Sequence, residues 1–404
     1  MTNEKEQVKT SDLNNINNNS RSSDIDQTDK ADKTADKENN NNAAEGAPRD
    51  LLSYEYDELE ALLLSVGEPK YRARQIFGAL SRGKSPNDMP GVPRALGERL
   101  ASVAPYHLPR VARKQVSAVD GTAKYLFEMA DGACVESVLM RYEHGNTVCV
   151  SSQVGCRMGC AFCASTIGGR VRDLTAGEIL GQIIAVGADS GERVDNIVMM
   201  GIGEPLDNYQ NVTRFLRLVN DSRGVNIGYR HISLSTCGLA DGIRRLAEER
   251  LPITLSISLH APTDEAKSAI MPVDKRYPIA ELMSACRYYY QSTGRRISFE
   301  YTLIKGKNAS KADAVRLADL LNRSLRGRGE GMPIHVNLIP VNPVRETGLM
   351  PPPRAEISRF AAELEAHAIR ATVRRRLGPD IDAACGQLRR SAAEAQNNAP
   401  NLSK

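Results

Sequence analysis

The spacing of hydrophobic positions divides the chain into three zones of different period. Residues 50–104 place apolar side chains at helical spacing, as in DLLSYEYDELEALLLSVG and KYRARQIFGALSRG, and they predict a small helical module. Residues 108–150 alternate apolar and polar positions, and DG and HGN turns interrupt the alternation. This second zone predicts β-hairpins.

From about residue 147, a strand-like run, a loop and a helix-length segment recur in turn. The strand-like runs are TVCVSSQ, NIVMMGIG, HISLSTCG, ITLSISLH, ISFEYTLIKG and IHVNLIP. The segments between them include TAGEILGQIIAVGADS, YQNVTRFLRLVND, IAELMSACRYYYQST and KADAVRLADLLNRS. Six such units predict an α/β fold with a parallel sheet, which we expect to form a partial (β/α)6 barrel. Polar motifs follow the strands at their carboxyl ends, where barrel active sites are built.

Composition predicts a tail without regular structure at each end of the chain. Residues 1–49 are rich in Asn, Asp, Lys and Ser, with little to bury, so we expect them to be disordered. The expected regions are a disordered tail (1–49), a helical accessory domain that binds RNA (50–106), a β-hairpin region (107–146), the barrel core (147–390) and a flexible tail (391–404).

Charge and overall composition narrow the class of protein only slightly. The 404 residues are 41% apolar and carry a formal net charge of +4, which suits a polyanionic partner without requiring one. The absence of Trp argues against broad aromatic stacking on nucleic acid. We find neither a run of about 18 apolar residues nor the apolar segment of a secretory signal, so we expect a cytoplasmic protein without a membrane span. Eight cysteines in such a chain favour metal binding or catalysis over a disulfide framework.

Three closely spaced cysteines carry the strongest chemical signal. The segment GCRMGCAFCAS places Cys156, Cys160 and Cys163 as C-x3-C-x2-C. Three thiolates can hold a [4Fe–4S] cluster and leave its fourth iron open, and an open iron can chelate S-adenosylmethionine. An electron from the cluster can then cleave the sulfonium. A structural zinc site is the alternative, but it requires four closed ligands, and the sequence offers no second pair beyond an unusually spaced Cys149.

Further motifs extend the signal over about residues 50–390. They are CVSSQVGC, MGIGEPLDN, LSTCG, SLHAP, VNLIPVNP and GPDIDAACGQL. The cysteine motif, with Phe162 between its last two cysteines, resembles the radical S-adenosylmethionine superfamily. The wider set resembles one family within it, the RlmN family of dual-specificity RNA adenine-C2 methyltransferases.

The resemblance implies a role for each residue that matches the family's motifs. The residues implied to contact S-adenosylmethionine are Gly203, Glu204, Ser235, Ser258, Leu259, His260 and Asn342. Cys385 would become an S-methylcysteine whose methylene adds to adenine, Cys149 would release the product through a transient disulfide with Cys385, and Glu136 would accept the C2 proton. Taken singly, these residues have ordinary structural interpretations: a satisfied polar group at a strand end, a buried thiol or a hairpin carboxylate.

The same resemblance implies the substrates and partners. They are adenosine in 23S rRNA and at position 37 of tRNA, two molecules of S-adenosylmethionine per methylation, and a flavodoxin-type electron donor to a monomeric enzyme. The helical module and basic patches would hold the RNA. Three alternatives stay open at this point: a C8-adenosine methyltransferase of the related resistance family, a radical enzyme acting on another substrate, and a non-catalytic RNA-binding protein with a structural metal.

Overall fold

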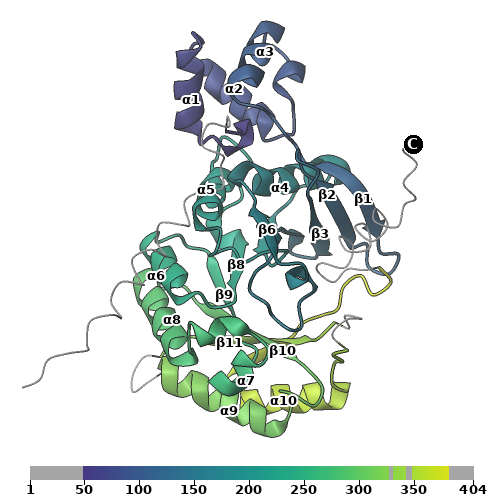
Figure 1. Cartoon of the computed structure of the whole chain (residues 1–404), viewed down its shortest axis with the longest axis vertical. Helices are drawn as coiled ribbons and strands as arrows, with labels where there is room; N and C mark the ends of the chain where they lie inside the picture. Colours follow the sequence, from purple (N-terminus) through teal and green to yellow (C-terminus); the bar gives the residue numbers. More distant parts are fainter. Residues whose placement is uncertain (1–48, 327–330, 343–347, 382–404) are drawn as a thin grey trace, which may run out of the picture. The chain divides into compact units, whose positions relative to one another are not determined.

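A computed structural model describes residues 49–326, 331–342 and 348–381 (Figure 1). Every described residue belongs to one compact unit, Pro48–Lys404. Apart from Arg49, the expected tails over 1–49 and 391–404 lie outside the described residues. No helix in the described ranges is long and apolar enough to cross a membrane.

Short helices form the first part of the described chain. They are η2 (Leu51–Ser53), α1 (Tyr56–Ser65), α2 (Tyr71–Leu80), η3 (Pro86–Asp88) and α3 (Arg94–Val103). Leu59 and Leu63, one helical turn apart on α1, are fully buried, as the helical spacing predicts. The Ser53 hydroxyl accepts a hydrogen bond from the Gly177 amide at 2.8 Å, which attaches this helical segment to helix α4 (Ala176–Ser190).

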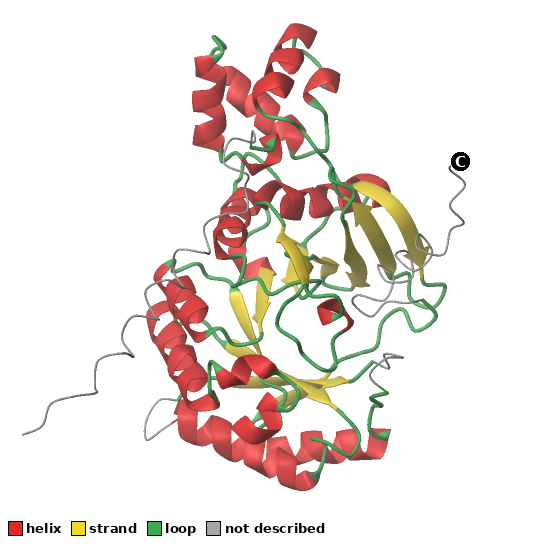
Figure 2. Ribbon diagram, in the orientation of Figure 1, coloured by secondary structure: helices red, strands yellow, loops and turns green. Residues whose placement is uncertain are grey.

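A ten-stranded sheet forms the centre of the molecule (Figure 2). Its first four strands are antiparallel neighbours: β1 (Arg110–Val116), β2 (Ala123–Glu128), β3 (Cys134–Tyr142) and β4 (Gly145–Cys149). From β4 onward each strand runs parallel to the next: β7 (Asn196–Met199), β8 (Ile232–Thr236), β9 (Thr254–Ser258), β10 (Ile297–Leu303), β11 (Ile334–Pro340) and β12 (Arg370–Val373). The sheet is open, with β1 and β12 at its edges, and it confirms the predicted α/β class.

Helices follow the parallel strands, as the repeated pattern predicts. After α4 they are α5 (Tyr209–Asn220), α6 (Ala240–Glu248), α7 (Asp264–Ser268), α8 (Ile279–Thr293), α9 (Lys311–Leu321) and α10 (Arg354–Ala366), with short turns at η5 (Tyr229–His231), η6 (Pro272–Lys275) and η7 (Asn322–Arg326). Their apolar faces pack on the strands in one main core. In a parallel sheet this arrangement brings the carboxyl ends of all strands to one edge.

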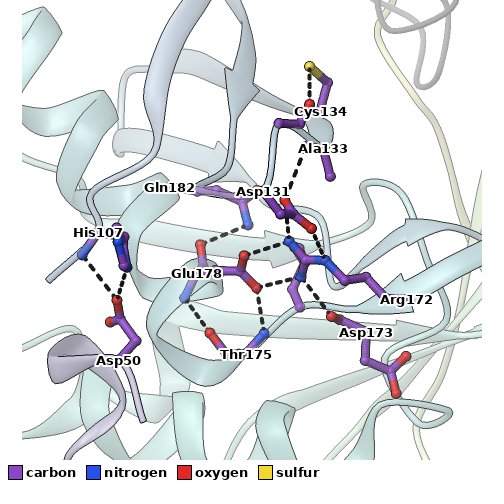
Figure 3. A network of polar contacts seen from close by, with 12 residues as sticks. Asp50, His107, Asp131, Ala133, Cys134, Arg172, Asp173, Thr175, Glu178 and Gln182 are labelled. Carbon is purple, nitrogen blue, oxygen red and sulfur yellow. Dashed lines mark hydrogen bonds and ion pairs between the residues drawn. The ribbon is translucent and has the colours of Figure 1, made fainter. Parts of the chain in front are cut away.

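A small hairpin continues the chain on either side of the three-cysteine motif. It consists of β5 (Gln153–Gly155) and β6 (Arg170–Asp173), with the single turn η4 (Ala164–Thr166) between them. Arg172 of β6 donates two hydrogen bonds to the Glu178 carboxylate, both at 2.8 Å, and two to the Asp131 carboxylate at 2.7 and 2.9 Å (Figure 3). This network ties the hairpin to α4 and to the β2–β3 turn, so the base of the cysteine loop is held from two sides.

Candidate active site

The cysteine loop spans the residues between β5 and β6. Cys156 and Cys160 are buried, with exposed fractions of 6% and 9%, and Cys163 is half-buried. All three thiols line a single cavity of about 250 Å³ at the carboxyl edge of the sheet. The structure therefore brings the three predicted ligands together.

Backbone hydrogen bonds fix the path of this loop. The Cys156 amide donates to the Gly169 carbonyl at 3.1 Å, and the Ala161 amide donates to the Ile270 carbonyl at 2.9 Å. Gly155 has φ +80°, and a Cβ there would lie 2.0 Å from the Gly169 oxygen. Only glycine fits this position, because a side chain would both strain the backbone and separate the two sides of the hairpin.

Asp207 connects the cysteine loop to the loop that follows β7. Its buried carboxylate accepts hydrogen bonds from the Arg157 guanidinium and from Gln153 Nε2 at 3.0 Å. Arg157 lies directly after the first cysteine, and the Gln153 Oε1 atom accepts from the Glu204 amide at 2.9 Å. The GEPLDN motif thus holds the cysteine loop through a charge-assisted contact.

The donor set suits iron bound by sulfur. Burial, followed by the neighbouring acidic groups, raises the pKa of the Cys156 thiol to about 12, and burial with the adjacent cysteines raises that of Cys160 as well. Such thiols become thiolates only when a cation compensates their charge, which an iron–sulfur cluster does. Within the described residues, no three His, Cys, Asp or Glu side chains lie close enough together to hold one metal ion, so the fit rests on the shared cavity and the sulfur chemistry.

Most of the predicted cofactor-binding residues line the same cavity as the cysteines. They are Gly203, Glu204, Ser235, Ser258, His260 and Asn342, which come from the carboxyl ends of β8 and β9 and from the loops after β7, β9 and β11. Leu259 does not line it, because its fully buried side chain packs into the main core. A two-residue alternation explains the difference, since Ser258 and His260 lie on one side of the chain and Leu259 on the other.

Glu204 is held by backbone donors from two loops. Its Oε1 atom accepts from the Leu206 amide at 3.0 Å, and its Oε2 atom accepts from the Cys237 amide at 2.7 Å. Complete burial raises the pKa of the carboxyl, and these hydrogen bonds oppose the rise. Each oxygen has a second lone pair, so the expected contact with the amino group of a methionine moiety stays a prediction.

His260 presents a neutral ring to the cavity. Its Nδ1 atom accepts a hydrogen bond from the Thr302 amide at 2.9 Å, so a neutral ring carries its proton on Nε2. Burial lowers the pKa of the imidazole to about 3, with a smaller contribution from Lys267. The ring meets the Phe162 ring edge-on at 4.8 Å, which brings the phenyl group of the cysteine motif against the loop after β9.

Sequence reasoning missed some residues of this cavity. Met271 and Thr302 lie in its wall. Glu300 also lines the cavity, is only 4% exposed and accepts from Asn337 Nδ2 at 2.7 Å. A carboxylate in the middle of the otherwise uncharged run ISFEYTL was the signal that could have identified it.

A second, larger cavity adjoins the first. It has a volume of about 830 Å³, contains Cys149 and shares Ile339, Val341, Asn342 and Arg374 with the cysteine cavity. Its other lining residues include the basic side chains of Arg354, Arg375 and Arg376. Cys149 thus lines a cavity that shares four wall residues with the cysteine cavity, whereas Cys385 lies outside the described residues.

Glu136 lies on the same face of the sheet as Cys149. Cys149 of β4 pairs with Val138 of β3, and Glu136 is two positions from Val138, so all three side chains project to one side. The Glu136 carboxylate forms an ion pair with Lys124 of β2 at 3.0 Å, and both side chains are almost fully buried, at 3% and 0% exposed. Glu136 lines neither cavity.

Comparison with known proteins first defines the class. A sequence profile described as the Radical SAM superfamily matches residues 150–318. A crystal structure of a radical SAM methyltransferase from Sphaerobacter thermophilus is similar to this chain, with a TM-score of 0.79 and 44% identity, covering 84% of this chain and 99% of that one. The fold and the cysteine cavity thus define a radical S-adenosylmethionine enzyme.

Curated relatives then define the family within this class. A protein from Clostridium novyi is 46% identical over 85% of this chain and 98% of its own length. Another from Alkaliphilus oremlandii is 49% identical over 84% of this chain and 97% of its own length. Both bear the name "Probable dual-specificity RNA methyltransferase RlmN". The chain belongs to the RlmN family.

Proposed function

We propose that this enzyme methylates C2 of adenosine in 23S rRNA and at position 37 of tRNA, in the cytoplasm, as a monomer supplied with electrons by a flavodoxin-type donor. The observation that carries the proposal is the position of Cys149 in a cavity of about 830 Å³ that shares a wall with the cysteine cavity. A radical enzyme that acts on an unrelated small molecule has no need of a thiol there. The names of the relatives support RNA as the substrate.

The smaller cavity is the proposed cofactor site. Cys156, Cys160 and Cys163 would hold a [4Fe–4S] cluster, and when bound, the cluster would supply the electron that cleaves S-adenosylmethionine. The residues proposed to hold S-adenosylmethionine are Gly203, Glu204, Ser235, Ser258, His260 and Asn342. His260 can donate from Nε2 because its Nδ1 is occupied by the Thr302 amide. We assign Leu259 the role of anchoring its two neighbours, since its side chain lies in the core.

The larger cavity is the proposed site of methyl transfer. Cys385 would carry the methyl group, and its methylene carbon would form the bond to C2 of adenine. Glu136 would take the C2 proton, and its buried carboxylate lies 3.0 Å from the Lys124 ammonium. The Cys149 thiolate would then attack the Cys385 sulfur, so that a disulfide forms as the bond between sulfur and the methylene carbon breaks. The released carbon would take up a proton and become the methyl group of the base.

Exposed arginines at the mouth of the larger cavity suit an RNA substrate. Arg354, Arg374, Arg375 and Arg376 are exposed and line it. Guanidinium groups bind phosphates through paired hydrogen bonds, and such contacts position a nucleic acid without selecting its sequence. The target adenine must leave its stack with neighbouring bases to enter the larger cavity, because an enzyme cannot reach C2 while the base is stacked.

Analysis of cellular RNA tests the proposal. RNA from cells with and without the protein is digested to nucleosides and analysed by mass spectrometry. We expect 2-methyladenosine to disappear from 23S rRNA and from tRNA when the protein is absent. Loss of 8-methyladenosine instead would contradict C2 chemistry and favour the related C8 family, and unchanged RNA would contradict RNA methylation altogether.

Cysteine variants test the chemistry of the larger cavity. Cys149→Ala should trap enzyme and RNA as a covalent species visible on denaturing gels, because the release step is lost. Cys385→Ala should give neither methylation nor the covalent species. Cys134→Ala is the matched control, since Cys134 begins β3 but lines neither cavity. Methyl transfer at the wild-type rate by both the Cys149 and the Cys385 variants would contradict the proposed role of these thiols.

A further inference from the structure

A groove between α9 and α10 is lined by an unusual number of cations. It has a volume of about 720 Å³, and five basic side chains line it: Lys305, Lys307, Lys311, Arg316 and Arg359. All five are exposed to solvent. We call this feature the basic groove. The only carboxylates in its lining are Asp313 and Glu356, so the groove has a formal net charge of +3.

Internal ion pairs neutralise only part of this charge. Arg316 pairs with Asp313 at 2.6 Å, and Lys311 pairs with Glu363 at 3.3 Å. Lys305, Lys307 and Arg359 form no ion pair within the part of the chain that the structure describes. Three cations that repel one another across a concave surface attract a polyanion more strongly than an isolated surface lysine does.

The basic groove lies beside the larger cavity, with helix α10 between them. Arg354 and Ile357 of α10 line the larger cavity, whereas Glu356 and Arg359 of the same helix line the groove. The Lys305 amide also donates to the carbonyl of Met350, a residue of the cavity wall, at 2.9 Å. The two spaces are therefore separated by about one helix diameter, roughly 10 Å.

Both helices that flank the groove begin there. α9 starts at Lys311 and α10 at Arg354, and the two helices pack against each other (Figure 1). Their first turns present the positive end of the helix dipole, and Ser310 and Asp313 cap the first turn of α9. The helix dipoles add to the positive potential of the basic side chains, which remain the main source of charge in the groove.

We propose that the basic groove binds the phosphodiester backbone of the substrate RNA, on nucleotides that flank the adenosine held in the larger cavity. The inference rests on the proposed function. RNA is favoured over an acidic electron-donor protein because the groove adjoins the cavity of Cys149 and shares no lining residue with the cysteine cavity. Phosphate contacts at this site would strengthen binding to any sequence and would not select the base.

The test compares salt dependence of RNA binding by the full chain. The variant K305Q/K307Q removes two groove cations, and Arg193→Gln is the matched control. Arg193 is exposed and precedes β7, so it lies at the amino edge of the sheet, opposite the cavities. Binding of a fluorescent substrate RNA is measured between 50 and 200 mM KCl. Each lost phosphate contact should lower the slope of log K against log[salt] by about 0.7.

Raising KCl from 50 to 200 mM weakens RNA binding by both proteins. If K305Q/K307Q has lost two phosphate contacts, the affinity of the wild type should fall about sevenfold more than that of the variant. KM for RNA should rise while kcat at saturating RNA and cleavage of S-adenosylmethionine are retained. An unchanged slope, or an equal change in Arg193→Gln, would overturn the proposal while leaving the proposed function intact. The groove would instead be a donor-docking surface if the variant loses activity with flavodoxin but keeps it with a chemical reductant.

Discussion

The buried ion pair between Lys124 and Glu136 gives the sharpest energetic prediction. The two charged atoms lie 3.0 Å apart, and the side chains are 0% and 3% exposed. Lys124→Met preserves the volume of the side chain and removes the ammonium group that lies 3.0 Å from the buried Glu136 carboxylate. Removing one member of such a pair destabilises a protein by about 3–5 kcal/mol, because the remaining ion keeps its full desolvation penalty.

The double variant K124M/E136M separates the pair from its surroundings. Removing both charges should recover most of the lost stability. The losses in the free energy of unfolding of the two single variants should therefore add up to at least about 2 kcal/mol more than the loss in the double variant. A matched comparison is Lys114→Met, because Lys114 pairs with Asp189 while the two side chains are 35% and 32% exposed. Water screens that pair, and its loss should change stability by less than about 1 kcal/mol.

Urea unfolding at pH 7 measures each free energy by linear extrapolation. A change below 1 kcal/mol for Lys124→Met, or additive effects in the double variant, would refute the energetic argument. The double variant also tests the chemistry, since it should fold and yet fail to methylate RNA. Methylation by K124M/E136M would show that Glu136 is not the proton acceptor.

Three further predictions concern the cysteine cavity. Asp207→Asn should lower the iron and acid-labile sulfide bound per chain after reconstitution, because the charge that anchors the cysteine loop is lost; wild-type loading would contradict this role. His260 is neutral in the fold with a pKa of about 3 but titrates near 6.5 when unfolded, so stability is lost as pH falls below 6.5, by about 2 kcal/mol at pH 5. His260→Asn should flatten this part of a denaturation-versus-pH profile, and an equally steep profile would exclude the imidazole as its source. Gly155→Ala should lower the free energy of unfolding by at least about 3 kcal/mol, because its Cβ would meet a backbone oxygen. The control Gly168→Ala should lower it less, because Gly168 also has a positive φ but nothing lies within 4 Å of its added Cβ. Equal losses would contradict the clash as the cause.

The sequence predicted the six main parallel strands because each is a short apolar run that ends in a polar motif. It missed β12, whose segment RATV is an edge strand with mostly exposed side chains and therefore no apolar pattern. The hairpin β5–β6 was also missed, because strands of three and four residues are too short to show a period. Local pattern predicts elements of ordinary length and fails at edges and tight turns.

The polar contacts within the site were harder to predict from the sequence. Asp207 and Arg157 are 50 positions apart, and Lys124 meets Glu136 only through the register of a hairpin. Such pairs depend on tertiary placement, which spacing along the chain does not encode. The cysteine motif was accessible because its three ligands lie within one short loop, so its chemistry needs no knowledge of the fold.

The continuous pairing of β3 with β4 has a consequence for how this enzyme is assembled from parts. The superfamily match covers residues 150–318 and so begins one residue after Cys149. The portion shared with other radical enzymes contains the cysteine loop, whereas Glu136 and Cys149 enter on a hairpin that precedes it and Asn342 enters after it. Because β4 pairs with β3 on one side and with β7 on the other, continuous strand pairing joins the generic and the family-specific portions. Moving Glu136 and Cys149 into another radical enzyme would therefore require the strand pairing of β3 and β4 as well as the two side chains.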